Sequence, residues 1–207
     1  MNNSLQRIRR IFLRVLASKN PVSRNVIQLK RHYRLKSFQK NQTKILEICG
    51  GKTPLQLDYL NVDILDWPTI DVLADLHETL PFETNSIDTI ISVATLEHFH
   101  VPDIKKILLE FHRILKSGGV LEIGIPSLEK IITYYKTNGC DDVVLRYLHG
   151  AQKDIYDIHL CIADFQRFKH LLEEAGFTQI SEQPYDYPRH DKTMMMKICA
   201  KKHDTVL

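Results

Sequence analysis

The sequence predicts an α/β fold built on a mostly parallel β-sheet, and three observations between residues 44 and 126 lead to this prediction. Short apolar runs recur there, and each is followed by a polar or glycine-containing turn. Several of these turns carry an acidic residue directly after the run. In open α/β sheets, ligands bind beyond the carboxyl ends of the strands, so these turns are the expected site. The runs read KILEICGG, YLNVDI, IDVLADL, SIDTIISVATLEHF and VLEIGIP.

The first run, Ile45–Ile48, is a short apolar segment that predicts a buried strand. Gly50 and Gly51 follow it, and glycines allow backbone amides to approach a ligand closely. A phosphate-binding loop is excluded because Leu46 occupies the position where that motif requires its first glycine. A G-x-G-x-x-G dinucleotide motif is also absent from this turn.

Asp63 ends the second run and Asp75 ends the third, so both carboxylates are expected at the same edge of the sheet as the glycines. An ionised Asp63 suits the two hydroxyls of a ribose, because a carboxylate only accepts hydrogen bonds. Asp75 is expected to accept from the exocyclic amine of adenine. The alternative is that each Asp caps a helix or a turn. The predicted cofactor-binding residues are Glu47, Cys49, Gly50, Gly51, Asp63, Ile64, Asp75, Leu76 and Ala94.

The elements that follow are predicted from helical periodicity and from capping residues. Met194, Met195 and Met196 are interpreted as core residues of the last strand rather than as a metal-binding group. The expected elements are a helix over residues 104–115 that ends at Gly118-Gly119, a strand over 120–125, a helix between Asp164 and Gly176, and strands over 177–182 and 193–200.

Several of these motifs together resemble class I S-adenosylmethionine-dependent methyltransferases of the type 11-like kind. The closest resemblance is to a group with a shortened first loop found among cell-surface polysaccharide genes. It covers Lys44 to Pro126, and LLEEAGF at residues 171–177 resembles the lead-in to the family's sixth strand. The motifs are ILEICGG, NVDI, LPFETNSIDTIISVATLEHF, FHRILKSGG and LEIGIPSLE.

This resemblance implies a Rossmann-like methyltransferase fold, with a seven-stranded, mostly parallel sheet, an antiparallel last strand and an N-terminal helical arm. It also implies S-adenosyl-L-methionine as the cofactor. Two departures are visible in the first motif. Cys49 stands where the family usually has a glycine, and only a dozen residues separate Gly51 from Asp63. The helix after the first strand is therefore expected to be short or missing.

Length and composition bound the organisation of the chain. A chain of 207 residues with 43% hydrophobic residues has enough apolar surface for one α/β core. We expect a basic helical arm over residues 1–43 and a methyltransferase domain over residues 44–207. The four cysteines lie far apart without a C-x-x-C pair, which argues against a zinc site or a disulfide framework. No metal ligands are predicted, and the reducing cytoplasm is the expected compartment.

The N-terminal arm together with Lys44 carries twelve basic residues, and no acidic residue occurs before Glu47. Its first helix is amphipathic, which indicates peripheral contact of residues 1–20 with the inner face of a membrane. The segment is too short to span a bilayer and has no signal-peptide cleavage site. The alternatives are a lid packed over the cofactor and, less favoured, a nucleic-acid contact. The apolar face comprises Leu5, Ile8, Phe12, Val15 and Leu16, with Arg7, Arg10 and Arg14 opposite.

A hydroxyl acceptor needs a base, and histidine suits this role because its pKa is near neutral. The candidates are His98, His100, His149, His159, Tyr187 and His190. His98 and His159 are the predicted catalytic pair, because His98 is expected at the cofactor edge and Asp157-Ile158-His159 resembles a pattern of the short-loop group. The predicted function is methyl transfer from S-adenosylmethionine to a small-molecule or saccharide-linked acceptor. Two alternatives remain open. One is a catalytically degenerate binding or scaffold protein in surface-polysaccharide biosynthesis, and the other is an RNA methyltransferase.

Overall fold

The structure is a computed structural model that describes residues 21–203 of the chain. The predicted membrane-contacting helix of residues 1–20 lies outside the described residues, so its prediction stays open. Among the described helices, none combines the length and the hydropathy that a membrane crossing requires.

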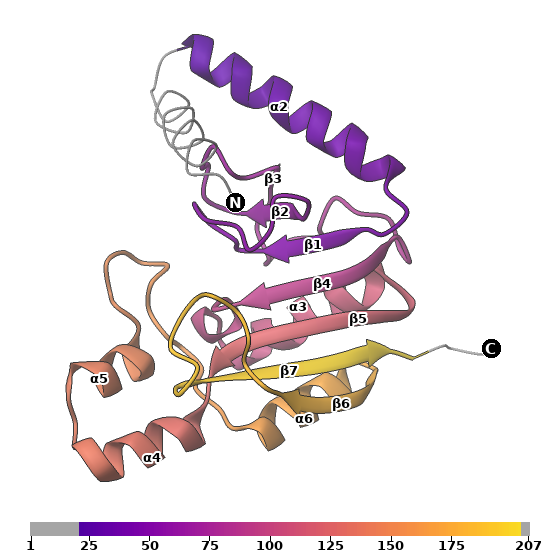
Figure 1. The fold of residues 1–207 in the computed structure, drawn as a ribbon. Helices are drawn as coiled ribbons and strands as arrows, with labels where there is room; N and C mark the ends of the chain where they lie inside the picture. Colours follow the sequence, from indigo (N-terminus) through magenta and orange to yellow (C-terminus); the bar gives the residue numbers. More distant parts are fainter. Residues whose placement is uncertain (1–20, 204–207) are drawn as a thin grey trace.

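The described chain forms a seven-stranded sheet in the order β3-β2-β1-β4-β5-β7-β6. All neighbouring strands are parallel except that β7 runs antiparallel to both β5 and β6 (Figure 1). This is the α/β fold class predicted from the sequence. The strands are β1 (Ile45–Ile48), β2 (Leu60–Asp63), β3 (Val72–Leu73), β4 (Ile87–Val93), β5 (Leu115–Pro126), β6 (Phe177–Gln183) and β7 (Met195–Lys202).

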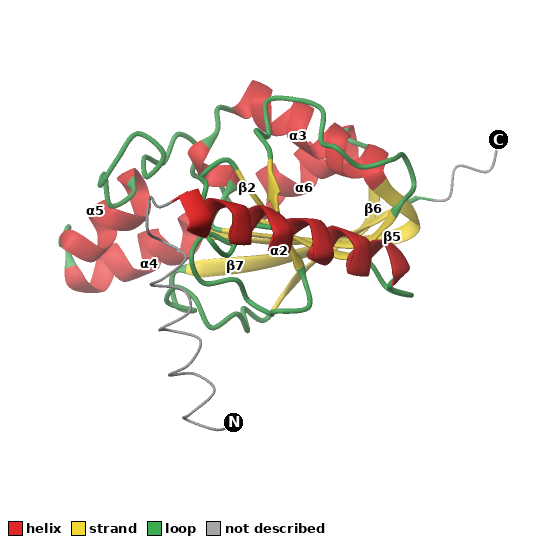
Figure 2. Cartoon of the chain, turned by 90° about the horizontal axis from the view of Figure 1, so that it is seen from above, coloured by secondary structure: helices red, strands yellow, loops and turns green. Residues whose placement is uncertain are grey.

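Helices α3 (Val101–Ile114) and α6 (Phe165–Glu174) cover one face of the sheet (Figure 2). Their apolar sides bury residues such as Ile107, Phe111 and Leu171 against the strands, in one large core cluster. Asp164 caps α6 by accepting a hydrogen bond from the Arg167 N–H, as predicted. The other helices are α2 (Pro21–Lys40), η1 (Leu96–His98), α4 (Leu128–Asn138) and α5 (Asp142–His149).

The opposite face of the sheet has no helix between β1 and β2, because residues 49–59, all described, form turns and bends only. The predicted loss of this helix is therefore confirmed. Side chains alternate across a strand, so Glu47 points to this face while Leu46 and Ile48 point to the other. The segment 184–193 covers this face instead, and its Tyr185 is buried in an apolar cluster with Ile91, Val93 and Met195.

Helix α2 belongs to the packed structure, although the sequence assigned it to a basic arm. Its Arg34 binds both carboxylate oxygens of Asp71 at 3.2 Å and donates to the Tyr59 carbonyl at 2.6 Å. Arg31 donates to the Ile70 carbonyl at 3.0 Å. Phe38 lies in the large core cluster and is buried. These contacts hold α2 against β2 and the β2–β3 connection.

Two strand boundaries differ from the predicted ones. β5 begins at Leu115, which pairs with Ile87 of β4. The register between β4 and β5 then shifts before Thr89 pairs with Val120, and Gly118 in this part of β5 has a φ of +70°. β7 begins at Met195, because Thr193 is held in a turn by hydrogen bonds to the Asp191 carboxylate. The three consecutive methionines are buried, as predicted, although Met194 precedes the strand.

Candidate active site

Two adjoining cavities lie at the carboxyl ends of the parallel strands, where the sequence predicted a ligand site. The smaller has a volume of about 440 Å³ and the larger about 650 Å³. Three residues line both cavities: Cys49 after β1, Ala94 after β4, and His98 in η1. Helices α4 and α5 lie beyond this end of the sheet (Figure 1). The two cavities therefore meet at the centre of the sheet edge.

The smaller cavity brings together six of the predicted cofactor-binding residues. Asp63 is almost fully buried, and its carboxylate accepts from the N–H groups of Gly51 at 3.2 Å and Leu65 at 2.9 Å. These bonds fix the carboxylate while leaving acceptor capacity toward the cavity. The six predicted residues in its lining are Cys49, Asp63, Ile64, Asp75, Leu76 and Ala94.

Asp75 lies two residues beyond β3 and is held by His77. The backbone N–H and the ring Nδ1 of His77 both lie 2.9 Å from its Oδ1. The His77 backbone hydrogen bond is the main cause that holds the pKa of Asp75 below its ordinary value, with burial opposing it. Asp75 is therefore ionised at neutral pH and can accept hydrogen bonds from a ligand.

Gly50 and Gly51 do not line either cavity; they shape the turn behind them. The Gly50 N–H donates to Asn61 Oδ1 at 3.1 Å. A Cβ at Gly50 would lie 2.5 Å from that oxygen and 2.8 Å from the Glu47 carboxylate, so only glycine fits. Gly51 adopts a φ of +57° and donates its N–H to Asp63. Gly51 thus positions Asp63 directly, whereas Gly50 holds the turn against Asn61.

Glu47 also lies outside the two linings. Its buried carboxylate accepts from the Leu55 N–H at 2.7 Å and forms an ion pair with Arg189 at 2.5 Å. Arg189 additionally donates to the Thr53 carbonyl. Glu47 therefore ties the segment 50–58 to the segment 184–193, and Arg189 from this network lines the larger cavity.

The larger cavity is lined mainly by residues that the sequence analysis did not single out. They come from η1, from α5, from the loop between α5 and α6, and from the segment before β7. Nothing in their spacing links them, because they become neighbours only when the chain after β5 folds back over the sheet edge. Besides the predicted pair, the polar residues of this lining are Glu97, Arg146, Tyr147, Lys153, Asp157, Arg189, His190 and Asp191.

His98 and His159 lie side by side at this cavity, with ring centroids 5.0 Å apart. The Nδ1 atom of His98 lies 3.0 Å from the Ile158 carbonyl, and that of His159 lies 2.8 Å from the Tyr147 carbonyl. Burial lowers the pKa of both histidines, against the opposing effect of these carbonyls. Both rings are therefore neutral at pH 7, with the proton on Nδ1 and a free electron pair on Nε2.

Glu97 lies beside the two histidines and is almost completely buried. Its Oε2 atom has no hydrogen-bond partner among the described residues. Burial raises the pKa of Glu97 to about 8, although backbone N–H groups of Glu97 and Thr95 oppose the shift. The sequence analysis treated Glu97 only as part of a family motif. An acidic residue followed by histidine directly after a central strand was the available signal.

Comparisons with known proteins bear on the fold that carries this site. Residues 39–123 match the family described as a methyltransferase domain. No curated protein sequence matches the chain. Three solved structures with similar folds are informative.

One is an S-adenosylmethionine-dependent methyltransferase, a possible histamine N-methyltransferase, from Thermotoga maritima. It is 19% identical, with a TM-score of 0.55 over 84% of this chain and 89% of that one. Another, from Archaeoglobus fulgidus, is 16% identical, with a TM-score of 0.54 over 86% and 94%. Human N-acetylserotonin methyltransferase, in complex with S-adenosylmethionine, is 13% identical, with a TM-score of 0.51 over 77% and 47%. Residues 39–123 thus match a methyltransferase domain, and the described chain has the Rossmann-like fold of S-adenosylmethionine-dependent methyltransferases.

Proposed function

We propose that the protein transfers a methyl group from S-adenosylmethionine to a hydroxyl of a small-molecule or saccharide-linked acceptor. The observation that carries this proposal is the meeting of two cavities at Cys49, Ala94 and His98. One cavity is assigned to the nucleoside and the other to the acceptor. The methyl group is then transferred from the cofactor to the acceptor at the junction of the two cavities.

The smaller cavity has the chemistry that an adenosine needs. Asp63 offers a fixed carboxylate for the ribose hydroxyls, and Asp75 offers a second one. Ile64, Leu76 and Phe99 add apolar surface to the same lining, which suits a purine ring. Bound S-adenosylmethionine supplies an electrophilic methyl group, and holding an acceptor next to it provides much of the rate.

The larger cavity suits a polyhydroxylated acceptor, because its lining offers charged donors and acceptors on several sides. Arg146 and Lys153 are donors, while Asp157 and Asp191 are acceptors. His98 and His159 face this cavity beside the junction, so the hydroxyl proton of the acceptor leaves at this end. His98 lines both cavities and His159 only the larger one.

Calorimetric titration of the full chain with S-adenosylhomocysteine tests the cofactor assignment. We expect binding in the micromolar range, and we expect Asp63→Ala to weaken it by about tenfold or more, since a hydrogen bond to a charged group contributes about 1.5–3 kcal/mol. The matched control is Asp58→Ala, an exposed position outside both linings that should bind like the wild type. No binding up to millimolar concentrations would instead favour a degenerate scaffold protein.

The acceptor class is tested by incubating the protein with tritiated S-adenosylmethionine and separate pools of nucleotide sugars, free monosaccharides and short RNA. Incorporation into a saccharide pool supports the proposal. Incorporation into RNA alone would overturn the acceptor assignment in favour of an RNA methyltransferase.

A further inference from the structure

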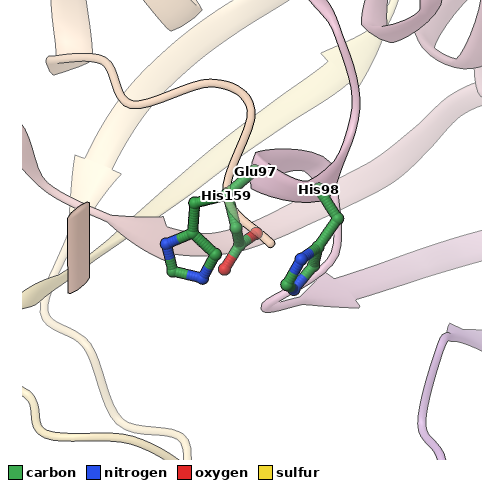
Figure 3. A group of neighbouring side chains, drawn as sticks. All are labelled: Glu97, His98 and His159. Carbon is green, nitrogen blue, oxygen red and sulfur yellow. The ribbon is translucent and has the colours of Figure 1, made fainter. Parts of the chain in front are cut away.

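Three side chains with metal-binding atoms converge at the junction of the cavities. Glu97 and His98 come from η1, and His159 comes from the loop between α5 and α6. Each offers one ligand atom, and these atoms lie within 4.8 Å of one another. In Figure 3 the carboxylate of Glu97 lies between the two imidazole rings. The three residues are called the Glu97–His98–His159 cluster below.

Each of the three side chains offers one possible ligand atom to this cluster. A carbonyl oxygen only accepts, so the Nδ1 atoms of His98 and His159 must carry their protons toward Ile158 and Tyr147. Each Nε2 is left with an electron pair. Glu97 adds Oε2, which is buried and has no partner among the described residues. Because burial raises the pKa of Glu97 to about 8, the free carboxyl carries a proton at pH 7, and a divalent cation that displaces this proton would meet electron pairs from all three side chains.

The hydrogen bonds behind the histidines are those that metal ligands use in proteins. A metal-binding histidine usually donates its second ring N–H to a carbonyl or carboxylate, which fixes the ring and its tautomer. Both histidines of the cluster do this with backbone carbonyls.

The loop that carries His159 is fastened to η1 by its backbone. The Glu97 carbonyl accepts from the N–H groups of Leu160 at 2.7 Å and Cys161 at 3.1 Å. Gly150 closes the loop with a φ of +79°, and a Cβ there would lie 2.3 Å from the Asp157 carbonyl oxygen. The position of His159 relative to Glu97 is therefore fixed by the main chain, as a preformed binding site requires.

We propose that the Glu97–His98–His159 cluster binds one divalent transition-metal ion, such as Zn²⁺, through the carboxylate and the two Nε2 atoms. Imidazole nitrogens favour such ions over Mg²⁺ and Ca²⁺, which prefer oxygen ligands. Zinc ligands lie about 2.0–2.2 Å from the ion and hence about 3.3 Å from one another. The ligand atoms now lie within 4.8 Å of one another, so binding requires them to move closer together. The sequence analysis predicted no metal because it considered cysteine spacing.

Three protein ligands leave at least one coordination position open, and the larger cavity lies on that side. The role of the ion there rests on the proposed function. An acceptor hydroxyl bound to the ion would lose its proton to water in the cavity, because a metal lowers the pKa of a bound hydroxyl strongly. The oxygen electron pair then forms the bond to the methyl carbon, while the C–S bond breaks and its electron pair stays on sulfur. In this arrangement neither histidine acts as the base.

The test uses the full chain, freed of metal with a chelator and then titrated with Zn²⁺ by calorimetry and with Co²⁺ by visible absorption. We expect about one ion per chain, and d–d bands of cobalt that indicate nitrogen and oxygen ligands. Glu97→Gln and His159→Ala should each weaken binding by about 100-fold or more, since even loss of an outer partner costs about 10–100-fold. The matched control His190→Ala lines the same cavity outside the cluster and should keep the ion.

Thermal unfolding with and without Zn²⁺ separates a lost site from a misfolded variant. Zn²⁺ should raise the Tm of the wild type and of His190→Ala, whereas Glu97→Gln should unfold cooperatively without a Zn²⁺-dependent shift. Absence of binding by the wild type at millimolar Zn²⁺ and Co²⁺, or equal binding by all variants, would overturn the metal site. S-adenosylhomocysteine titration is independent of this result: metal binding without nucleoside binding removes the proposed function only, and the converse removes the metal site only.

Discussion

Cys49 and Ala94 end the neighbouring parallel strands β1 and β4 in the same left-handed backbone conformation, with φ of 54° and 52°. Both residues line both cavities. This conformation is unfavourable for a residue with a side chain, by about 1–2 kcal/mol. The strain lies where the chain leaves β1 and β4 at the edge of the two cavities. Functional sites commonly store backbone strain in this way.

Ala94→Gly tests this strain directly. Glycine adopts positive φ freely but gains more entropy on unfolding, so we expect the free energy of unfolding to stay level or rise by up to about 1 kcal/mol. Ala74 is partly buried, like Ala94, but its φ is not positive. Ala74→Gly should therefore lower the free energy of unfolding by about 0.5–1 kcal/mol. Urea midpoints measure both. Equal destabilisation by the two substitutions would show that Ala94 is unstrained.

His159→Ala should separate methyl transfer from cofactor binding. His159 lines only the larger cavity, so S-adenosylhomocysteine affinity should change by less than about twofold. Transfer to an acceptor pool should fall by about tenfold or more, because acceptor activation is lost. The exposed His170 on α6, in a surface pair with Glu174, provides the control His170→Ala, which should keep the rate. A normal rate in His159→Ala removes this residue from the site.

Arg34→Ala should weaken the attachment of α2. Asp71 is only 4% exposed, and removing Arg34 leaves its carboxylate with fewer compensating donors. Because Arg34 itself is partly exposed, we expect a loss of about 1–3 kcal/mol, less than for a fully buried pair. Arg24→Ala on the exposed surface of the same helix should change stability by less than about 0.5 kcal/mol. Denaturant unfolding measures both variants. Equal stabilities would mean that this ion pair contributes nothing.

Asp88 gives a pH-dependent contribution to stability. Burial opposes its ionisation, but hydrogen bonds from Lys116 at 2.7 Å and from the Lys44 N–H outweigh burial and hold its pKa below the ordinary 3.8. A carboxylate with a lowered folded-state pKa stabilises the fold above pH 3.8, and this contribution is lost as the pH falls through the folded pKa. The stability difference between wild type and Asp88→Asn should therefore be constant near neutral pH and shrink in acid. A difference that does not change with pH would contradict this assignment.

Much of the smaller cavity was predictable, because it is built locally. Asp63 and Asp75 follow adjacent parallel strands, and the topology of such a sheet brings strand ends together. The short distance from Gly51 to Asp63 likewise left no room for a helix, as found. The roles of Gly50 and Gly51 could not be predicted from their position after the first strand. Their N–H groups donate to Asn61 and Asp63, and neither glycine lines the cavity.

The larger cavity was less predictable, because it depends on long-range contacts. His98 was predicted from its place after a central strand and His159 from a family-like pattern, but their joint orientation with Glu97 requires a loop whose path is set by Gly150. The ion pair between Glu47 and Arg189 joins residues that are 142 positions apart in the sequence. Neither residue lies in a sequence pattern that predicts its partner. Side-chain convergence of this kind follows from the folded backbone and not from local spacing.

The most direct test of the account is a crystal structure of the protein with S-adenosylhomocysteine. The account predicts the ribose at Asp63, the purine in the smaller cavity beside Leu76, and the sulfur at the junction formed by Cys49, Ala94 and His98. A nucleoside bound elsewhere, or a smaller cavity closed by the Cys49 side chain with no ligand in it, would contradict the central claim that the two cavities form one methyl-transfer site.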